Sequence, residues 1–106
     1  MIPYAEFKRL DIRVGRVLDV NIHPKADKLL VLKIDIGGEV RTIVAGIKGY
    51  YEREELMDKK VIVITNLEQR ELRGIKSEGM ILAAVNDDKV MLITPDEDIR
   101  EGAIVQ

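Results

Sequence analysis

The sequence has no cysteine, one histidine and one serine among its 106 residues. Without cysteine there can be no disulfide, no thiolate metal site and no cysteine nucleophile. No apolar run approaches the roughly 20 residues needed to span a membrane. The segment Met1–Glu6 lacks the basic stretch and apolar run of a signal peptide. We therefore expect a soluble cytoplasmic protein that does not insert into membranes.

Recognisable catalytic and metal-binding motifs are also missing. The residues around Ser77 do not have the G-x-S-x-G spacing of a nucleophile elbow. A P-loop beginning at Gly74 would need Lys-Ser or Lys-Thr where Met80-Ile81 stand. The residue types present leave a catalytic Ser77–His23 pair open. His23 alone cannot hold a metal. We expect it to cap backbone in a turn, or to contact phosphate when charged. We expect no catalytic residue, no metal and no cofactor.

Charge is unevenly distributed along a chain whose net charge is −2. Residues 1–50 hold nine Lys or Arg and six Asp or Glu, whereas residues 86–106 hold two and six. A basic first half joined to an acidic tail allows one cationic face on an acidic protein. The length suits a single domain, which buries about two-thirds of the surface of its unfolded chain.

The first half of the chain shows the alternation of apolar and polar residues that is typical of strands. Asp11–Ile22 predicts one long strand that serves two sheets, with a bulge or sharp bend at Gly15. Leu30–Ile36 and Val40–Ile47 predict a hairpin, because Gly37-Gly38 can supply the positive φ of a tight turn.

The second half contains two apolar runs separated by a charged loop. Val61–Thr65 is rich in β-branched residues and predicts a strand buried on both faces. Met80–Val85 predicts a second buried strand. Loops held between rigid elements often carry binding groups, and we therefore expect residues 66–79 to be the centre of function.

Short helices and further β structure complete the predicted fold. An N-terminal helix is expected to pack Phe7 and Leu10 on the barrel, and Glu52–Asp58 predicts another short helix. Val90–Thr94 predicts a further strand, and Ala103–Val105 is an apolar end. The order predicts an all-β protein with short helices: an OB-fold, a five-stranded Greek-key barrel with an N-terminal helix and a C-terminal β extension.

Nucleic-acid binding is the function that this fold and charge pattern favour. OB-folds bind oligonucleotides on the face of strands 2 and 3 and on the loops after strands 1 and 4. Those positions carry Lys25, Lys28, Lys33, Arg41, Asn66, Arg70, Arg73, Lys76 and Ser77. The chain has only three tyrosines and one phenylalanine, and none lies on the predicted binding strands. Base stacking is therefore disfavoured, and recognition of a folded RNA by phosphate and 2′-hydroxyl contacts is favoured.

Several blocks of the sequence resemble one known family. DIRVGRV, HPKADKLLVLKIDIG, RTIVAGI, VIVITNL and LRGIKSEGMILAA are similar to the EMAP-II-like tRNA-binding domain, in order and over essentially the whole chain. That domain occurs at the C-terminus of many methionyl-tRNA synthetases, as a separate β subunit, in free-standing tRNA-binding proteins and in a related secretion chaperone. The resemblance implies one OB-fold domain over residues 1–106 that has no activity of its own and binds tRNA by shape, with weak sequence selectivity.

The resemblance also implies site residues. We expect tRNA to be bound by residues in or beside the matching blocks, namely Lys25, Lys28, Lys33, Arg41, Asn66, Arg73, Lys76, Ser77 and Met80. We expect Arg41 and Arg73 to engage phosphates, and Asn66 and Ser77 to bond ribose or an exposed base. Met80 is expected to pack on a sugar or base edge, or in the core.

The partners implied are tRNA, the catalytic chain of a methionyl-tRNA synthetase, and a second copy of the chain. The domain would raise the synthetase's affinity for tRNA, and residues 86–106 would form the homodimer. Two alternatives stay open: a polypeptide-binding chaperone of the secretion type, and a structural adaptor that docks onto a synthetase.

Overall fold

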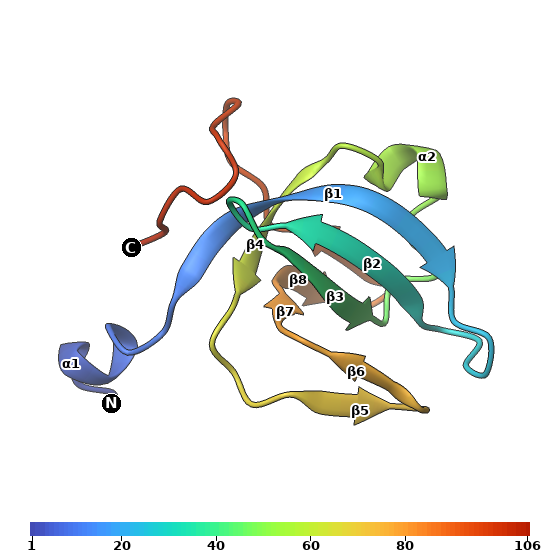
Figure 1. The fold of residues 1–106 in the computed structure, drawn as a ribbon, viewed down its shortest axis with the longest axis horizontal. Coiled ribbons are helices and arrows are strands. Elements are labelled where there is room, and N and C mark those ends of the chain that lie inside the picture. Colours follow the sequence, from blue (N-terminus) through green and yellow to red (C-terminus); the bar gives the residue numbers. More distant parts are fainter.

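The computed structural model describes residues 1–106, and its centre is a five-stranded antiparallel sheet that curls into a nearly closed barrel (Figure 1). The strand order is β3-β2-β1-β4-β7. The strands are β1 Ile12–Ile22, β2 Leu30–Asp35, β3 Val40–Ala45, β4 Lys60–Ile64 and β7 Met80–Ile81. This is the OB-fold that the sequence predicted.

Two hairpins and two short helices are attached to the barrel. One hairpin pairs β5 (Arg70–Leu72) with β6 (Ile75–Ser77), and the other pairs β8 (Ala83–Asn86) with β9 (Lys89–Leu92). Helix α1 covers Tyr4–Phe7, and α2 covers Arg53–Leu56. Neither helix has the length and apolar character that crossing a membrane requires.

Strand β1 serves both halves of the barrel, as predicted, because its first part pairs with β4 and its second part with β2. The register shift in this strand lies between Val17 and Asp19, so the bulge expected at Gly15 is misplaced. Gly15 serves close packing instead. A Cβ there would lie 2.6 Å from Cγ2 of Ile34 and 2.9 Å from Cγ2 of Val63.

The barrel closes where β3 meets the segment that leads into β7. The backbone N–H of Glu78 donates to the carbonyl of Thr42 at 2.8 Å, and the Glu78 carboxylate accepts the N–H of Thr42 at 2.9 Å. Strand β7 is only two residues long. These two bonds therefore join β3 to the segment before β7, in place of the backbone hydrogen bonds that a longer β7 would make with β3.

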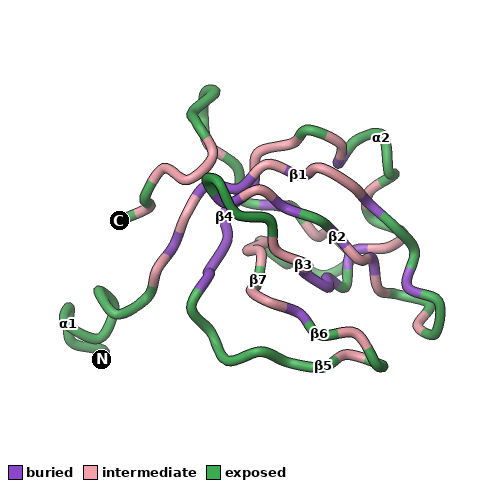
Figure 2. The backbone as a smooth tube through the Cα atoms, in the orientation of Figure 1, coloured by how far each residue is buried: buried purple, intermediate pink, exposed green.

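The barrel interior is filled by aliphatic side chains from β1 to β4 and α2. Figure 2 shows buried positions along these strands. The largest fully buried ones are Leu32, Ile34, Ile43, Leu56, Val17, Val61 and Val63. Burial of each such side chain contributes about 1.5–3 kcal/mol. Leu56 and Met57 pack against this core from the predicted short helix and its C-terminal end.

A second, smaller apolar cluster lies on the other face of β1 and β4. Ile12 and Val14 pack there with Ile62 and Ile64. The C-terminal segment covers this face, since Ala103 and Val105 pack against the cluster, and the N–H of Val105 donates to the Ile12 carbonyl at 2.9 Å. Strand β4 is therefore buried on both faces, which confirms the prediction from its β-branched run.

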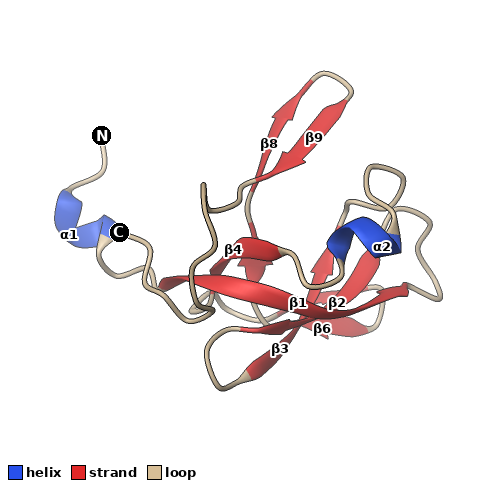
Figure 3. Cartoon of the chain, turned by 90° about the horizontal axis from the view of Figure 1, so that it is seen from above, coloured by secondary structure: helices blue, strands red, loops and turns tan.

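The second buried strand predicted at Met80–Val85 is wrong. The run divides into β7, which pairs with β4, and β8, which pairs only with β9. The β8–β9 hairpin projects from the barrel (Figure 3), so Val85 is largely exposed. A short apolar run has no periodicity that separates a barrel strand from an outward hairpin.

Helix α1 forms as predicted, but it does not pack on the barrel. It contains no buried residue, and it lies apart from the sheet in Figure 1. Phe7 and Leu10 are both exposed rather than in the core. Four residues make only about one turn, too few to bury an apolar stripe.

Candidate nucleic-acid interface

The largest hollow on the molecule brings together three of the predicted site residues. It is an open cleft of about 510 Å³, lined by Lys25, Ala26, Asp27, Lys28, Leu29 and Arg73. We call it the cationic cleft. Lys25 and Lys28 come from the loop after β1, and Arg73 comes from the β5–β6 hairpin, 45 positions further along the chain. The fold thus joins two segments that the sequence placed on separate loops.

The backbone of the β5–β6 hairpin sets the position of Arg73. Leu72 pairs with Ile75, which leaves Arg73 and Gly74 as a two-residue turn. Their φ values of 53° and 93° are both positive, as a type I′ turn requires. Gly74 adopts this conformation without strain, and Arg73 is held at the tip of the hairpin.

The loop that carries the two lysines is fastened at both ends. The N–H of His23 donates to the carbonyl of Leu29 at 3.2 Å, which closes the loop. The carbonyl of Lys28 accepts the N–H of Lys48 at 3.4 Å, which places the segment after β3 beside the cleft. Lys48 was not predicted as a site residue, because nothing in the sequence indicates that it lies next to Lys28.

Two further predicted cations are exposed on strands that adjoin the segments of the cleft. Lys33 lies on β2, opposite Thr42 of β3, and its ammonium donates to Thr42 Oγ1 at 2.6 Å. Lys76 lies on β6 opposite Glu71 of β5. Glu71 and the nearby Glu68 offset the positive charge of Arg70 and Lys76 in this hairpin. The positive charge of the hairpin is therefore least offset at its tip, where Arg73 lines the cationic cleft.

Met80 is 43% exposed, so it is not the core methionine that the sequence left open. It lines a small hollow beneath the β5–β6 hairpin, together with Val44, Arg70 and Leu72. A flexible, polarisable thioether in such a place can pack against a sugar or a base edge.

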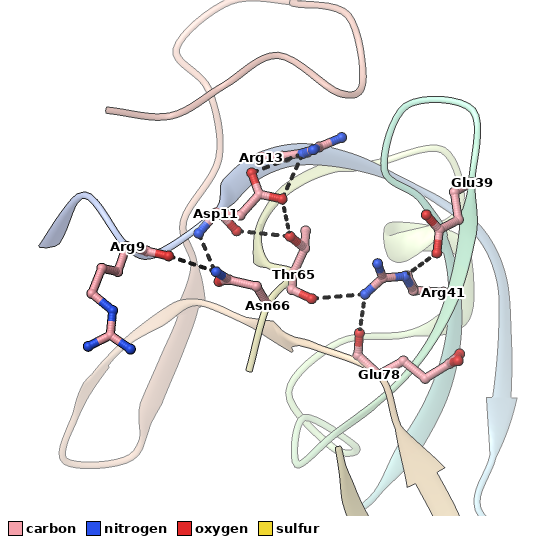
Figure 4. A network of polar contacts seen from close by, with 8 residues as sticks. All are labelled: Arg9, Asp11, Arg13, Glu39, Arg41, Thr65, Asn66 and Glu78. Carbon is pink, nitrogen blue, oxygen red and sulfur yellow. Dashed lines mark hydrogen bonds and ion pairs between the residues drawn. The ribbon is translucent and has the colours of Figure 1, made fainter. Parts of the chain in front are cut away.

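Arg41 lies outside the cationic cleft, and its side chain is occupied. One guanidinium nitrogen donates to the carbonyl of Thr65 at 2.9 Å and to that of Glu78 at 3.0 Å (Figure 4). Its Nε donates to the carboxylate of Glu39. These bonds hold β3 against the two segments that flank the 66–79 loop, so the structure gives Arg41 a role inside the fold.

Asn66 is exposed, but its side chain is likewise engaged by hydrogen bonds within the chain. Its Oδ1 accepts the backbone N–H of Asp11 at 2.8 Å, and its Nδ2 donates to the carbonyl of Arg9 at 2.7 Å (Figure 4). These two bonds fasten the N-terminal segment to the end of β4.

Asp11 and Thr65 stand beside this junction. The hydroxyl of Thr65 hydrogen-bonds the Asp11 carboxylate and lowers the pKa of that carboxyl below its ordinary range, with Arg13 adding to the effect. Burial acts in the opposite direction and is outweighed.

Ser77 is buried, and its hydroxyl links β6 to β3 by a hydrogen bond. Its Oγ accepts the N–H of Val44 at 2.9 Å and donates to the carbonyl of Gly79 at 3.0 Å. His23 is also buried, with Nε2 2.9 Å from the carbonyl of Leu72. The only serine and the only histidine each bond backbone and not one another, so the Ser–His pair left open above does not form. No three His, Asp or Glu side chains converge as a metal site.

An OB-fold with a cationic cleft at the loop after β1 and at the β5–β6 hairpin defines a binding domain of the oligonucleotide-binding class. The family model of the putative tRNA-binding domain matches residues 12–104. The chain belongs to this tRNA-binding domain family, as its sequence blocks predicted.

Relatives in sequence are methionine–tRNA ligases. The chain is 48% identical over 105 residues to the enzyme of Pyrococcus furiosus and 52% identical over 106 residues to that of Parabacteroides distasonis. Each match covers 99% of this chain, but only 14% and 16% of the length of those two enzymes.

Solved structures have the same fold over the whole chain. A methionyl-tRNA-synthetase-related protein from Pyrococcus horikoshii matches with a TM-score of 0.92 and 36% identity, over 100% of this chain and 98% of that one. The CsaA chaperone protein from Picrophilus torridus matches with a TM-score of 0.92 and 33% identity, over 100% of both chains.

Proposed function

We propose that this domain binds tRNA, catalyses no reaction itself, and raises the tRNA affinity of a methionyl-tRNA synthetase to which it is joined or bound. The observation that carries the proposal is the cationic cleft, in which Lys25 and Lys28 meet Arg73. The fold gathers these cations from distant parts of an acidic chain, and such a cluster attracts a polyanionic ligand. Membership of the tRNA-binding domain family indicates that this ligand is tRNA.

The cations of the cleft and its surroundings make the direct contacts in this proposal. Lys25, Lys28 and Arg73 engage phosphates of the tRNA backbone, with Lys33 and Lys76 adding charge and Met80 packing on a sugar or base edge. Arg41, Asn66 and Ser77 support the site from within the fold, because their side chains are already bonded. Since phosphates carry no sequence information, selectivity among tRNAs is weak.

Titration of labelled tRNA at low salt, followed by gel shift or fluorescence anisotropy, tests this function. We expect micromolar or tighter binding that weakens steeply as salt rises, because phosphate contacts release counterions. Lys28→Ala and Arg73→Ala should each weaken binding without unfolding the domain. Lys8→Ala, at an exposed cation that follows helix α1, is the matched control and should bind normally. Unbound tRNA at micromolar protein would refute the function, and normal binding by both cleft variants would refute the site.

We further propose that two copies of the domain associate through the extension formed by residues 86–106. Met91, Ile93 and Ile104 are large apolar side chains that stay exposed there, and association of two copies would remove them from water. Light scattering should give twice the 12.0 kDa of one chain. Met91→Asp should shift the protein toward monomer, whereas Val40→Asp, at an exposed residue of β3, should not. A monomeric wild type contradicts this proposal.

A polypeptide-binding chaperone is the second candidate, and one surface favours it. An apolar groove lies between the end of β3 and the β8–β9 hairpin, lined mainly by Val44, Ile47, Val85, Val90 and Leu92. The structural likeness extends to CsaA chaperone proteins. Suppression of aggregation of an unfolded client, unaffected by added tRNA, would favour this candidate; no suppression in the presence of clear tRNA binding would exclude it.

A further inference from the structure

The ring of His23 joins the two segments that form the cationic cleft. His23 is 3% exposed, the most deeply buried polar residue of the chain. Its Nδ1 lies 3.0 Å from the backbone N of Lys25, and its Nε2 lies 2.9 Å from the carbonyl oxygen of Leu72. A backbone N–H can only donate and a carbonyl can only accept, so the ring is neutral with its proton on Nε2.

The two partners of the ring stand next to the cations of the cleft. Lys25 itself lines the cleft, and Leu72 directly precedes Arg73 at the hairpin tip. The bridge therefore spans 49 positions of the chain and ties the lysine loop to the hairpin.

Strand β6 lies beside β3, whereas β5 and the hairpin tip are joined to the loop after β1 by the bond from His23 to Leu72. Strands β5 and β6 pair only with one another, and Ser77 fastens β6 to β3 at the end away from the tip. Such a ribbon has little stability of its own in water. Without the bridge, the tip with Arg73 would move relative to Lys25 and Lys28, and binding would have to order it.

We infer that His23 is a positioning residue for RNA phosphates: its neutral ring sets the distance between the lysine loop and Arg73, so that the cations can engage one stretch of backbone together. The inference rests on the proposed tRNA binding and adds a residue that touches no RNA. Fixing cations in advance strengthens binding, because less conformational freedom is lost when the phosphates arrive.

Two substitutions separate the two bonds of the ring. In His23→Asn, the side-chain oxygen can still accept the N–H of Lys25 in an Asx-turn, but the side chain is too short to reach Leu72. In His23→Gln, the longer amide can donate to the Leu72 carbonyl in place of Nε2. We expect His23→Asn to weaken tRNA binding about fivefold, and His23→Gln to retain more of the wild-type affinity. Equal losses in both variants, or none in His23→Asn, would overturn the inference.

A double-mutant cycle distinguishes positioning from a general structural role. If His23 acts through Arg73, then His23→Asn should have little further effect once Arg73 is alanine, because the cation that it positions is gone. Loss by the same factor in the wild-type and Arg73→Ala backgrounds would show that His23 acts elsewhere. Wild-type binding is measured first. If the wild type binds no tRNA, the proposed function is refuted. If it binds tRNA but the His23 and Arg73 substitutions show no coupling, only this inference is refuted.

One measurement needs no substitution and tests the bridge itself, even if the variants unfold. The chain has a single histidine, so a long-range ¹H–¹⁵N spectrum of the ring is unambiguous. We expect a protonated Nε2 and an unprotonated Nδ1, in free protein and with tRNA bound. A ring that exchanges between tautomers, or that loses this pattern when tRNA binds, would overturn the proposed bridge.

Discussion

The side-chain oxygen of Asn66 accepts a hydrogen bond from the backbone N–H of Asp11 at 2.8 Å, across 55 positions of the chain. Asn66 begins the charged loop where the sequence placed the centre of function, yet both ends of its exposed amide bond the N-terminal segment. Polar residues of this loop therefore divide into those that hold the domain together and those that face solvent at the cleft.

The amide of Asn66 should contribute to stability rather than to RNA affinity. Asn66→Ala removes two hydrogen bonds whose partners can reach water, so we expect a loss of about 1 kcal/mol in the free energy of unfolding. For a domain of this size the melting temperature should fall by about 4–8 °C. Thermal unfolding checks this, with Gln69→Ala, at an exposed amide of the same loop, as the control. Loss of tRNA binding at an unchanged melting temperature would instead assign Asn66 to the interface.

Gly15 should not tolerate even one added carbon. Gly15→Ala would place a Cβ 2.6 Å from Ile34 Cγ2, inside the filled barrel, and we expect a loss of about 1–3 kcal/mol from overpacking. Gly46→Ala is the matched control, since the nearest atom to its Cβ is 3.9 Å away, on Leu29. Denaturant unfolding of both variants measures the difference. Equal stability of the two would show that the barrel can relax around β1.

The hydroxyl of Thr65 should make part of the stability depend on pH. Because it lowers the pKa of Asp11 in the folded state, the resulting stabilisation is complete above the ordinary aspartate pKa of about 4 and is lost as pH falls through the folded value. Thr65→Val should therefore be less stable than wild type at pH 7, and the gap should narrow at pH 3. Unfolding midpoints at both pH values test this. A gap of the same size at pH 3 and pH 7 would mean that Asp11 titrates alike in both proteins.

The barrel was predictable because each of its long strands carries its own pattern. Alternation in β1 and β2, the Gly37-Gly38 turn and the β-branched run of β4 are local features, and local chemistry decides them. Met80–Val85 and α1 were harder, since a short apolar segment becomes buried only if another element covers it. In this chain the barrel reaches neither Val85 nor Phe7.

The candidate site was predictable in its elements but not in its individual side chains. Lys25, Lys28 and Arg73 lie on the loops that the OB-fold uses, and the structure brings these three together. Arg41 and Ser77 lie in the expected elements too, but each is also bonded to a partner 24 or more positions away in sequence. No local pattern shows which cation is paired inside the fold and which is free to meet a phosphate.

The slope of tRNA affinity against salt tests the central claim most directly, because it counts the phosphates that the protein neutralises. We propose measuring log Kd against log salt for wild type, Arg73→Ala and Arg41→Ala, each below its melting temperature. Removing Arg73 should reduce the slope by about one, the loss of one phosphate contact. Removing Arg41 should leave the slope unchanged while lowering stability. A reduced slope for Arg41→Ala, with an unchanged slope for Arg73→Ala, would contradict the assignment of the cationic cleft as the tRNA site.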